Sequence, residues 1–233
     1  MTDHLRFSSD ELNLAAYRLE TKQPQDVIAW GIEQFGTKIV LASSFGAEDV
    51  VLIDMLHKLA PDTPIFYLDT GKHFPETLMT RDRLQERYGM SFIQVLPKLS
   101  LEEQAAQYGD QLWEIEPNLC CQLRKVEPLA DILSTYSAWI TGIRREQAPT
   151  RAHAKKVEWD EKFQLVKLNP LADWTMEQVW SYIRAHDVIY NPLHDQHYPS
   201  IGCSVCTRPV KPGEDPRAGR WSGFAKTECG LHK

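Results

Sequence analysis

The sequence is poor in cysteine, has no long hydrophobic run and carries no excess of positive charge. Its 233 residues include 5 cysteines, and 32 Asp and Glu against 26 Lys and Arg leave a formal net charge of −6. No apolar run approaches the ~20 residues of a membrane-spanning helix, and residues 1–7 contain no apolar signal core. We therefore expect a cytoplasmic protein with reduced thiols and no membrane partner. The acidic balance argues against a general nucleic-acid binder but allows a local basic pocket.

Familiar nucleotide motifs and repeats are also absent. The chain has neither the G-x-x-x-x-G-K-[ST] of a P-loop nor the G-x-G-x-x-G of a dinucleotide fold. It contains no internal repeat and no low-complexity tract. With 42% hydrophobic residues, the length suits one full domain, and we predict a single domain over residues 1–233.

The few cysteines form a pattern. Four of them make two close pairs, Cys120–Cys121 and Cys203–Cys206, and Cys229 stands alone near the end. Four thiolates suit an iron–sulfur cluster or a tetrahedral zinc ion. Neighbouring residues on a helix point about 100° apart. Both members of the first pair can therefore bind one metal centre only if that centre is larger than a single ion or if the helix is distorted. The pattern favours a [4Fe-4S] cluster, with zinc, disulfides and free thiols as the alternatives.

Strands alternate with helices over the first two thirds of the chain. The expected strands are 38–43, 64–69, 91–96 and 138–141. The expected helices cover 25–35, 50–59 and 77–88, and capping boxes at Ser8–Glu11 and Ser100–Glu103 open two more. Strands separated by helix-length segments predict an α/β fold with a parallel, doubly wound sheet.

The last third differs in character. Residues 156–159 and 163–168 fit a hairpin, and 175–186 fit a short helix. From about residue 191 to 233, Pro, Gly, His and Arg become dense and periodicity disappears. This composition predicts a functional loop region and tail that belong to the same domain.

Two loops follow neighbouring predicted strands. Residues 43–49, Ser-Ser-Phe-Gly-Ala-Glu-Asp, precede a helix, and the free N–H groups and dipole of a helix start can hold a nucleotide. Residues 68–77 follow the next strand at the same sheet edge, where ligands bind in open α/β sheets. Ordinary turns are the alternative for each loop alone, but two such loops support each other.

Several cations lie close to these features in the sequence. Lys125 follows the first cysteine pair, and Arg144 follows a predicted strand. Arg217 and Arg220 precede Cys229. Each alone is most often a solvated surface charge, yet together they could clamp an anion. A thiol near a mobile terminus suits an enzyme that attacks one substrate and then presents an adduct to another protein.

Together these residues resemble the assimilatory adenylyl-sulfate (APS) and 3′-phosphoadenylyl-sulfate (PAPS) reductases. The resemblance runs from about residue 40 to 232, and its motifs are Ser44–Asp49, Leu68–Gly71, Cys120–Lys125, Trp139–Arg144, Cys203–Cys206 and Glu228–His232. The paired cysteines resemble the cluster-bearing branch, which generally takes APS, whereas the branch without them takes PAPS. The resemblance implies the adenine-nucleotide α-hydrolase-like (PP-loop) fold, with residues 44–49 as a modified pyrophosphatase loop.

The resemblance also implies a site and a reaction. The cluster ligands would be Cys120, Cys121, Cys203 and Cys206, and the nucleophile would be Cys229. The residues around the phosphosulfate would be Lys125, Arg144, Arg217, Arg220 and His232, and those near the nucleotide Ser43, Ser44 and Leu68. We expect thiol-dependent reduction of APS to sulfite and AMP through a Cys S-sulfo intermediate, in sulfate assimilation and cysteine biosynthesis. Thioredoxin or glutaredoxin would be the reductant.

Other functions fit parts of the pattern. Reduction of PAPS, alone or with APS, is the nearest alternative. A nucleotide-activating ligase or thiolase of the same fold would want a Ser-Gly-Gly-x-Asp-Ser loop, which this chain lacks. A non-enzymatic iron–sulfur or zinc-binding regulator would not need the isolated Cys229 and would usually show a DNA-reading helix. The nucleotide preference, the reductant and the oligomeric state, a homo-oligomer included, stay open at this point.

Overall fold

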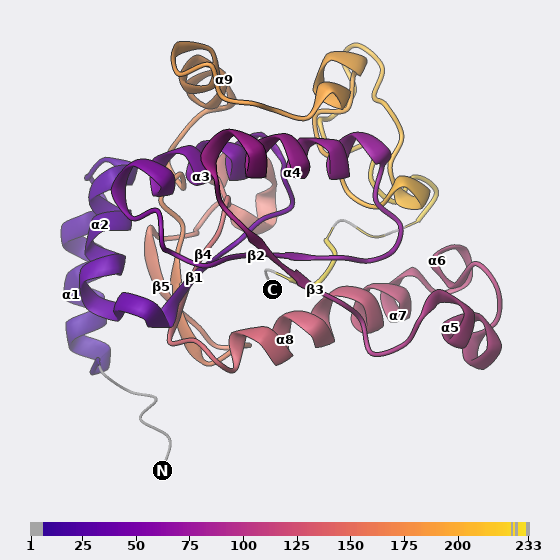
Figure 1. The fold of residues 1–233 in the computed structure, drawn as a ribbon, viewed down its shortest axis with the longest axis horizontal. Helices are drawn as coiled ribbons and strands as arrows, with labels where there is room; N and C mark the ends of the chain where they lie inside the picture. The colour runs from indigo at the N-terminus through magenta and orange to yellow at the C-terminus, as the bar shows by residue number, and fades with distance from the viewer. Residues whose placement is uncertain (1–6, 225, 227, 232–233) are drawn as a thin grey trace.

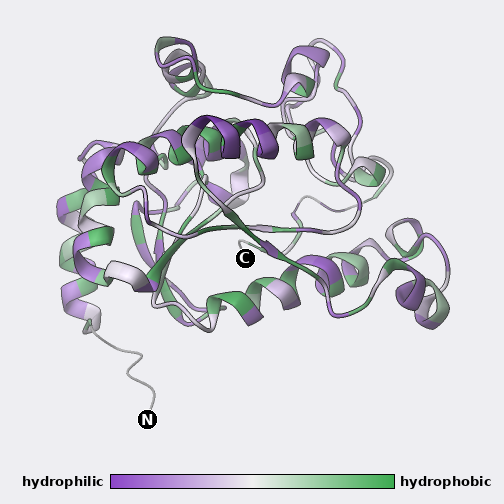
Figure 2. Cartoon of the chain, viewed as in Figure 1, coloured by the Kyte–Doolittle hydropathy of each residue, from purple (hydrophilic) through white to green (hydrophobic). Residues whose placement is uncertain are grey.

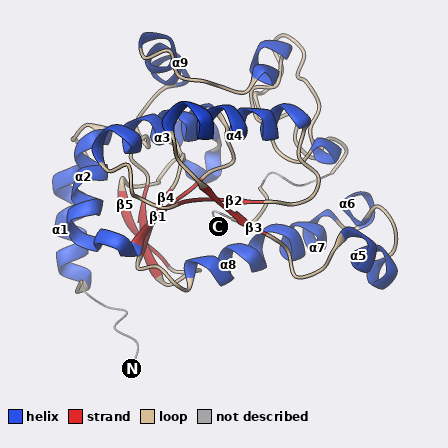
Figure 3. Ribbon diagram, in the orientation of Figure 1, coloured by secondary structure: helices blue, strands red, loops and turns tan. Residues whose placement is uncertain are grey.

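The structure is a computed structural model that describes residues 7–224, 226 and 228–231. The strands are β1 (Ile39–Ala42), β2 (Ile65–Leu68), β3 (Phe92–Val95), β4 (Ala138–Ile140), β5 (Val157–Asp160) and β6 (Leu165–Leu168). The α-helices are α1 (Ser9–Leu19), α2 (Pro24–Phe35), α3 (Ala47–Leu59), α4 (Pro75–Tyr88), α5 (Leu101–Tyr108), α6 (Leu112–Ile115), α7 (Pro117–Cys121), α8 (Glu127–Leu133) and α9 (Met176–Ala185). Short 3-10 turns and one π-helix, η2 (Gln122–Val126), join them, and loops dominate the segment after α9 (Figure 3).

The described strands form one sheet in the order β3-β2-β1-β4-β6-β5. Neighbours run parallel except β5 and β6, which form an antiparallel pair at one edge. Side chains of β1 alternate, since Ile39 and Leu41 enter one core cluster and Val40 enters the other. The strand order reverses beside β1, because the chain adds β2 on one side of it and β4 on the other. Open α/β sheets bind their ligands at such a reversal.

Helices cover both faces of the sheet, with α3 and α4 on one side and α8 on the other (Figure 1). The larger core includes Val27 of α2, Val50 of α3 and Ile183 of α9. The smaller core packs Leu129 and Leu133 of α8 against the sheet. Figure 2 shows hydrophobic strands between helices whose outer faces are hydrophilic. No helix in the described ranges combines the length and the hydrophobicity needed to cross a bilayer.

The predicted alternation of strands and helices is confirmed, as is the later hairpin, which is β5 and β6. Two helices begin earlier than predicted. α3 begins at Ala47 rather than Val50, because Gly46 in an extended conformation leads directly into the helix. α4 begins at Pro75 rather than Thr77, because proline suits the first helical turn. The parallel pairing of β6 with β4 and the helical run α6–α8 were not predicted.

Candidate active site

A cavity of about 450 Å³ opens at the carboxyl ends of β1, β2 and β4. On the sheet side its lining comes from residues 42–49, from residues 66–73 and from residues 139–147. On the other side the lining comes from residues 199–203, 215–217, 220–221, 228–229 and 231. The first set flanks the reversal in strand order, so the cavity lies where the topology predicts a ligand site.

The loop between β1 and α3 has a constrained shape. Phe45 adopts a φ of +59° although it is not glycine, and left-handed residues of this kind gather at functional sites. Its buried ring packs against Tyr67 and Phe92, with centroids 5.5 and 5.3 Å away, and its N–H donates to Ser43 Oγ at 3.0 Å. α3 then starts after Gly46 without a side-chain cap. The free N–H groups of its first turn are therefore available to an anion in the cavity.

Asp49 anchors the same loop from inside the protein. Its Oδ2 accepts hydrogen bonds from the N–H and the hydroxyl of Ser44 at 2.6 and 2.7 Å. Burial raises the pKa of Asp49 to about 6 despite these hydrogen bonds, and the charge of Glu48 adds to the rise. Gly142 leaves room for the carboxylate, because a Cβ at this position would collide with Asp49 Oδ1. The loop therefore depends on a buried carboxylate seated against a glycine.

The end of β2 presents Leu68 to the cavity, and the loop after it presents His73. The carbonyl of Leu68 accepts a hydrogen bond from His73 Nε2 at 3.0 Å. Burial lowers the pKa of His73, although this hydrogen bond and Asp69 act in the opposite direction. Asp69 in turn accepts from the Gly71 N–H at 2.9 Å and from the Gln94 amide at 2.6 Å. These contacts hold the end of β2 in place beside the ligand site.

Arg144 lines the cavity but is almost fully buried, with 2% of its side chain exposed. Its Nε donates to Glu48 Oε1 at 2.8 Å, and its Nη1 donates to Glu146 Oε2 at 2.9 Å. A further hydrogen bond reaches the carbonyl of Trp174 at 3.2 Å. These bonds tie the loop after β4 to the first turn of α3, and a contact of Arg144 with a phosphosulfate stays a prediction.

Arg220 is held against the wall of the cavity. Its guanidinium lies 4.5 Å from the ring centroid of Trp221, and its Nη1 donates to Ser200 Oγ at 3.1 Å. Gly202 permits this position, because a Cβ there would collide with the guanidinium. The Nε of Arg220 is buried and has no hydrogen-bond partner within the described residues. Buried donors are usually paired in folded proteins, so this one fits a ligand oxygen.

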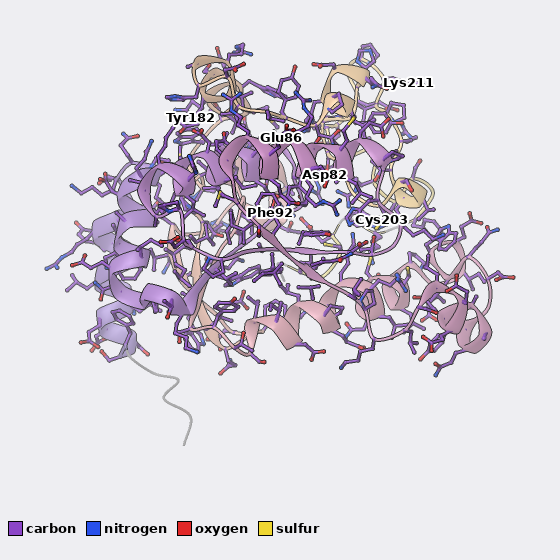
Figure 4. The ribbon with its side chains drawn as sticks, in the orientation of Figure 1. Asp82, Glu86, Phe92, Tyr182, Cys203 and Lys211 are labelled. Atoms are coloured by element: carbon purple, nitrogen blue, oxygen red, sulfur yellow. The ribbon has the colours of Figure 1, made fainter. Side chains whose placement is uncertain are left out.

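The four paired cysteines line a second cavity of about 20 Å³. One of them, Cys203, is labelled in Figure 4 and lies on the side of the molecule away from α1 and α2. Cys120 and Cys121 end α7, and the chain continues directly as the π-helix η2. The helix distortion that the adjacent pair requires is therefore present, and π-helical turns are frequent at functional sites.

Four thiols are the ligand type and the ligand number that a metal cluster needs. Their side chains are not arranged around a common point as the ligands of a bound ion would be. No three His, Cys, Asp or Glu side chains in residues 7–224, 226 and 228–231 are placed to hold a metal ion. Burial raises the pKa of Cys120 to about 11 and that of Cys206 to about 12. Burial would also raise the pKa of Cys203, but Lys125 and the hydroxyl of Thr70 at 3.4 Å outweigh it and lower the value. A full set of thiolates at neutral pH thus calls for the positive charge of a metal centre.

The two cavities share a wall. Thr70, Lys125, Cys203 and Trp221 line both of them. Burial would lower the pKa of Lys125, but the sulfurs of Cys203 and Cys229 outweigh it and raise the pKa above its ordinary value. Lys125 is therefore a cation that faces the cysteine cavity on one side and the larger cavity on the other.

The C-terminal segment brings Cys229 into the larger cavity, where the residue is half-buried near Lys125. The residues around Cys229 are anchored. The carbonyl of Gly230 accepts a hydrogen bond from Lys162 Nζ at 2.5 Å, and Leu231 packs on the smaller core. The predicted nucleophile thus lies beside the predicted anion-binding cation, although 104 residues separate Cys229 from Lys125 in sequence (229 minus 125).

Most residues predicted for the site lie around one cavity, which is lined by Ser43, Ser44, Leu68, Lys125, Arg144, Arg217, Arg220 and Cys229. The predicted contact of His232 lies outside the described residues. Sequence reasoning missed Gln147 and Arg151, which also line the cavity, and gave no role to Glu228. Glu228 belongs to a motif that carries the family resemblance, so the sequence pointed to it. Apart from its charge, Arg151 has no sequence feature that indicates a place in the site.

The chain is similar to known proteins over most of its length. The pattern of the phosphoadenosine phosphosulfate reductase domain matches residues 38–209. Adenosine 5′-phosphosulfate reductase of Halalkalibacterium halodurans is 50% identical over 234 residues, which cover 100% of this chain and 100% of that protein. The crystal structure of Candida auris PAPS reductase in a phosphate complex has a TM-score of 0.76 and 32% identity, covering 85% of this chain and 96% of that one. Candida glabrata FMN adenylyltransferase, at a TM-score of 0.59 and 16% identity over 88% of this chain and 69% of its own, shares the fold alone.

Proposed function

The chain belongs to the phosphoadenosine phosphosulfate reductase family, and on this premise we propose that it reduces adenylyl sulfate to sulfite and AMP. The observation that carries the proposal is one thiol, Cys229, next to the cation Lys125 in a cavity at the carboxyl ends of the sheet. A relative that bears the name of this activity matches the chain from end to end.

The cavity offers separate places for the two parts of the substrate. The start of α3 and the loop of Ser43 and Ser44 lie at the switch point of the sheet, which suits the nucleotide. Lys125 and Arg220 lie near Cys229 and suit the phosphosulfate, whose oxygens carry negative charge. Charge that builds on the bridging oxygen during reaction would meet the same cations.

The reaction then proceeds in three balanced steps. The Cys229 thiolate attacks the sulfuryl sulfur, the bond from that sulfur to the bridging oxygen breaks, and AMP leaves with the electron pair. This leaves Cys229–S–SO₃⁻. A thiolate of a dithiol reductant such as thioredoxin or glutaredoxin attacks the Cys229 sulfur, sulfite leaves with the electron pair, and a mixed disulfide forms. The second thiol of the reductant resolves it, so the reductant supplies two electrons.

We further propose that the two cysteine pairs hold a [4Fe-4S] cluster. Their shared cavity and the π-helix after Cys121 support this proposal. When bound, the cluster supplies fixed charge beside Lys125 and joins the segments of the two pairs. Protein purified without oxygen should contain about four iron and four sulfide per chain, and Cys203→Ser should lose both while Cys229→Ser keeps them. Stoichiometric zinc without iron would contradict the proposal.

Location and assembly also belong to the proposal. None of the five cysteines forms a disulfide, which is typical of a reducing compartment and supports a cytoplasmic enzyme. Reduction of PAPS is the second candidate activity, because the solved relative from Candida auris is a PAPS reductase. A homo-oligomer is compatible with the fold, and no contact described here depends on one.

Mass spectrometry of the covalent intermediate tests the activity. Incubation with APS and no reductant should add about 80 Da, the mass of SO₃, to the tryptic peptide 227–233 and release one AMP per chain. Cys229→Ser should bind AMP but form no adduct. Running the same assay with PAPS compares the two nucleotides. Wild-type protein that yields no adduct with either nucleotide would overturn the proposed function.

A further inference from the structure

Glu228 directly precedes Cys229, and its side chain is almost fully buried, with 2% exposed. Arg151 holds both carboxylate oxygens, since its Nε donates to Oε1 at 2.9 Å and its Nη2 donates to Oε2 at 2.8 Å. The hydroxyl of Thr150 also donates to Oε1, and Nη2 of Arg217 donates to Oε2, both at 3.2 Å. Each oxygen therefore accepts two hydrogen bonds. The carboxylate is thus fully engaged in these contacts and does not act as a general base or as a ligand of the substrate.

This contact fastens the end of the chain to the wall of the cavity. Thr150 and Arg151 belong to the 3-10 turn η4 (Pro149–Arg151), and Arg151 lines the cavity together with Cys229. Surface ion pairs contribute little, but removing one member of a buried pair leaves an uncompensated charge. The position of Cys229 thus depends on a bidentate bond made by its immediate neighbour.

From these contacts, and resting on the proposed function, we propose that Glu228 is a positioning residue for Cys229. The bidentate pair of Glu228 and Arg151, called the clamp below, holds the thiol in the cavity for attack on the sulfuryl sulfur. The clamp must open before the adduct on Cys229 reaches the reductant.

Arg217 links this clamp to the substrate. It lines the cavity and is a predicted phosphosulfate ligand, yet its Nη2 bonds to Glu228 in the structure. An arriving anion therefore competes with Glu228 for Arg217, while Arg151 keeps its bidentate bond. Formation of the adduct moves the sulfonate from the nucleotide to Cys229, the residue that follows Glu228 in the chain, and the two negative charges repel. This repulsion favours opening of the clamp after the adduct has formed, when Cys229 must reach the reductant.

The clamp also reaches the nucleotide loop. Nη1 of Arg151 donates to Gln147 Oε1 at 2.5 Å, and the Gln147 amide donates to Glu48 Oε1 at 2.9 Å. Glu48 lies in the first turn of α3 and lines the cavity. A continuous set of hydrogen bonds therefore runs from the residue before the nucleophile to the loop that suits the nucleotide.

Three variants test the proposal. Glu228→Gln removes the charge but keeps the shape, and Arg151→Lys keeps the charge but loses the bidentate geometry. Glu214→Gln is the matched control, because Glu214 forms a half-exposed pair with Arg208 at 3.0 Å in the same C-terminal region. Each protein is tested as isolated, with its metal centre, and AMP affinity and melting temperature report whether it is folded.

The two half-reactions are then measured separately by mass spectrometry of peptide 227–233. In Glu228→Gln and Arg151→Lys, formation of the 80 Da adduct should slow roughly 10- to 100-fold, because small misplacements of a reacting group have effects of this size. Release of sulfite from preformed adduct by dithiothreitol should not slow. Alkylation of Cys229 by iodoacetamide without substrate should become faster. Glu214→Gln should match wild type in all three measurements.

The outcomes separate the clamp from the proposed function. If wild type forms the adduct and folded Arg151→Lys forms it at the same rate, the clamp is wrong while the function stands. Equal slowing of both half-reactions would point to a general structural defect and would also overturn the positioning role. A wild-type protein without any adduct rejects the function itself.

Discussion

Replacing Asp49 by Asn should change how the stability of the protein depends on pH. Asp49 is buried beneath the loop after β1, where Ser44 donates two hydrogen bonds to it. Asparagine has nearly the same shape and keeps one oxygen that can accept from the Ser44 N–H, but it has no charge. The variant therefore isolates the effect of ionisation from the effect of packing.

The magnitude follows from the pKa of Asp49, which burial raises from 3.8 to about 6. Because the folded protein binds this proton more tightly than the unfolded chain, the contribution to stability is fully present below about pH 3.8. It is lost as the pH rises through about 6. One pKa unit corresponds to about 1.36 kcal/mol, so the whole loss is on the order of 3 kcal/mol. Somewhat less than half of it, about 1 kcal/mol, falls between pH 5 and pH 7.5.

Urea unfolding of both proteins at pH 5 and pH 7.5, under anaerobic conditions, measures this difference. Wild type should lose about 1 kcal/mol more than Asp49→Asn over this interval. Asp187→Asn is the control, because its side chain is 93% exposed and its variant should follow the wild-type curve. If Asp49→Asn and wild type change in parallel, burial does not dominate the ionisation of Asp49 and the reasoning fails.

Two other sites give direct tests. Lys125→Ala and Arg220→Ala should each lower kcat/KM with APS by an amount equivalent to about 2–4 kcal/mol, the range for a key charge-stabilising donor; unchanged values in both would reject their role as phosphosulfate ligands. Gly142→Ala should lower the free energy of unfolding by roughly 1–3 kcal/mol and weaken AMP binding, because its Cβ would displace the Asp49 carboxylate. Calorimetric titration with AMP and urea unfolding check this variant, and unchanged AMP affinity would separate Asp49 from the nucleotide loop.

Local features of the fold could be predicted because local chemistry determines them. The predicted capping boxes of Ser8 and Ser100 form as hydrogen-bonded pairs, and each opens a helix. The continuous apolar run of β1 is buried on both faces, as a central parallel strand requires. The position of β6 in the sheet could not be predicted in the same way, because a hairpin pattern does not say which of its two strands pairs with the rest of the sheet. Its unbroken burial over Leu165–Leu168, in contrast with the mixed burial of β5, accords with its place between β4 and β5.

The candidate site divides in the same way. Residues at or just after the ends of strands, such as Leu68 and Ser44, could be placed at one edge from topology alone. The partnership of Glu228 with Arg151 could not, because it joins residues 77 apart in the sequence. A glutamate near a chain end resembles a solvated charge until its surroundings are known. The π-helix after Cys121 was anticipated only as a need for distortion, since no residue pattern specifies it.

The shared wall between the two cavities affects what mutational scanning of this protein can resolve. Thr70, Lys125, Cys203 and Trp221 each face both cavities, so no substitution at these four positions changes only one of them. Effects of neighbouring substitutions that share contacts do not add. Variant libraries scored separately for nucleotide affinity and for iron content should therefore show correlated losses at these positions. Suppressor substitutions selected for one of the two properties should lie in the lining of the other cavity.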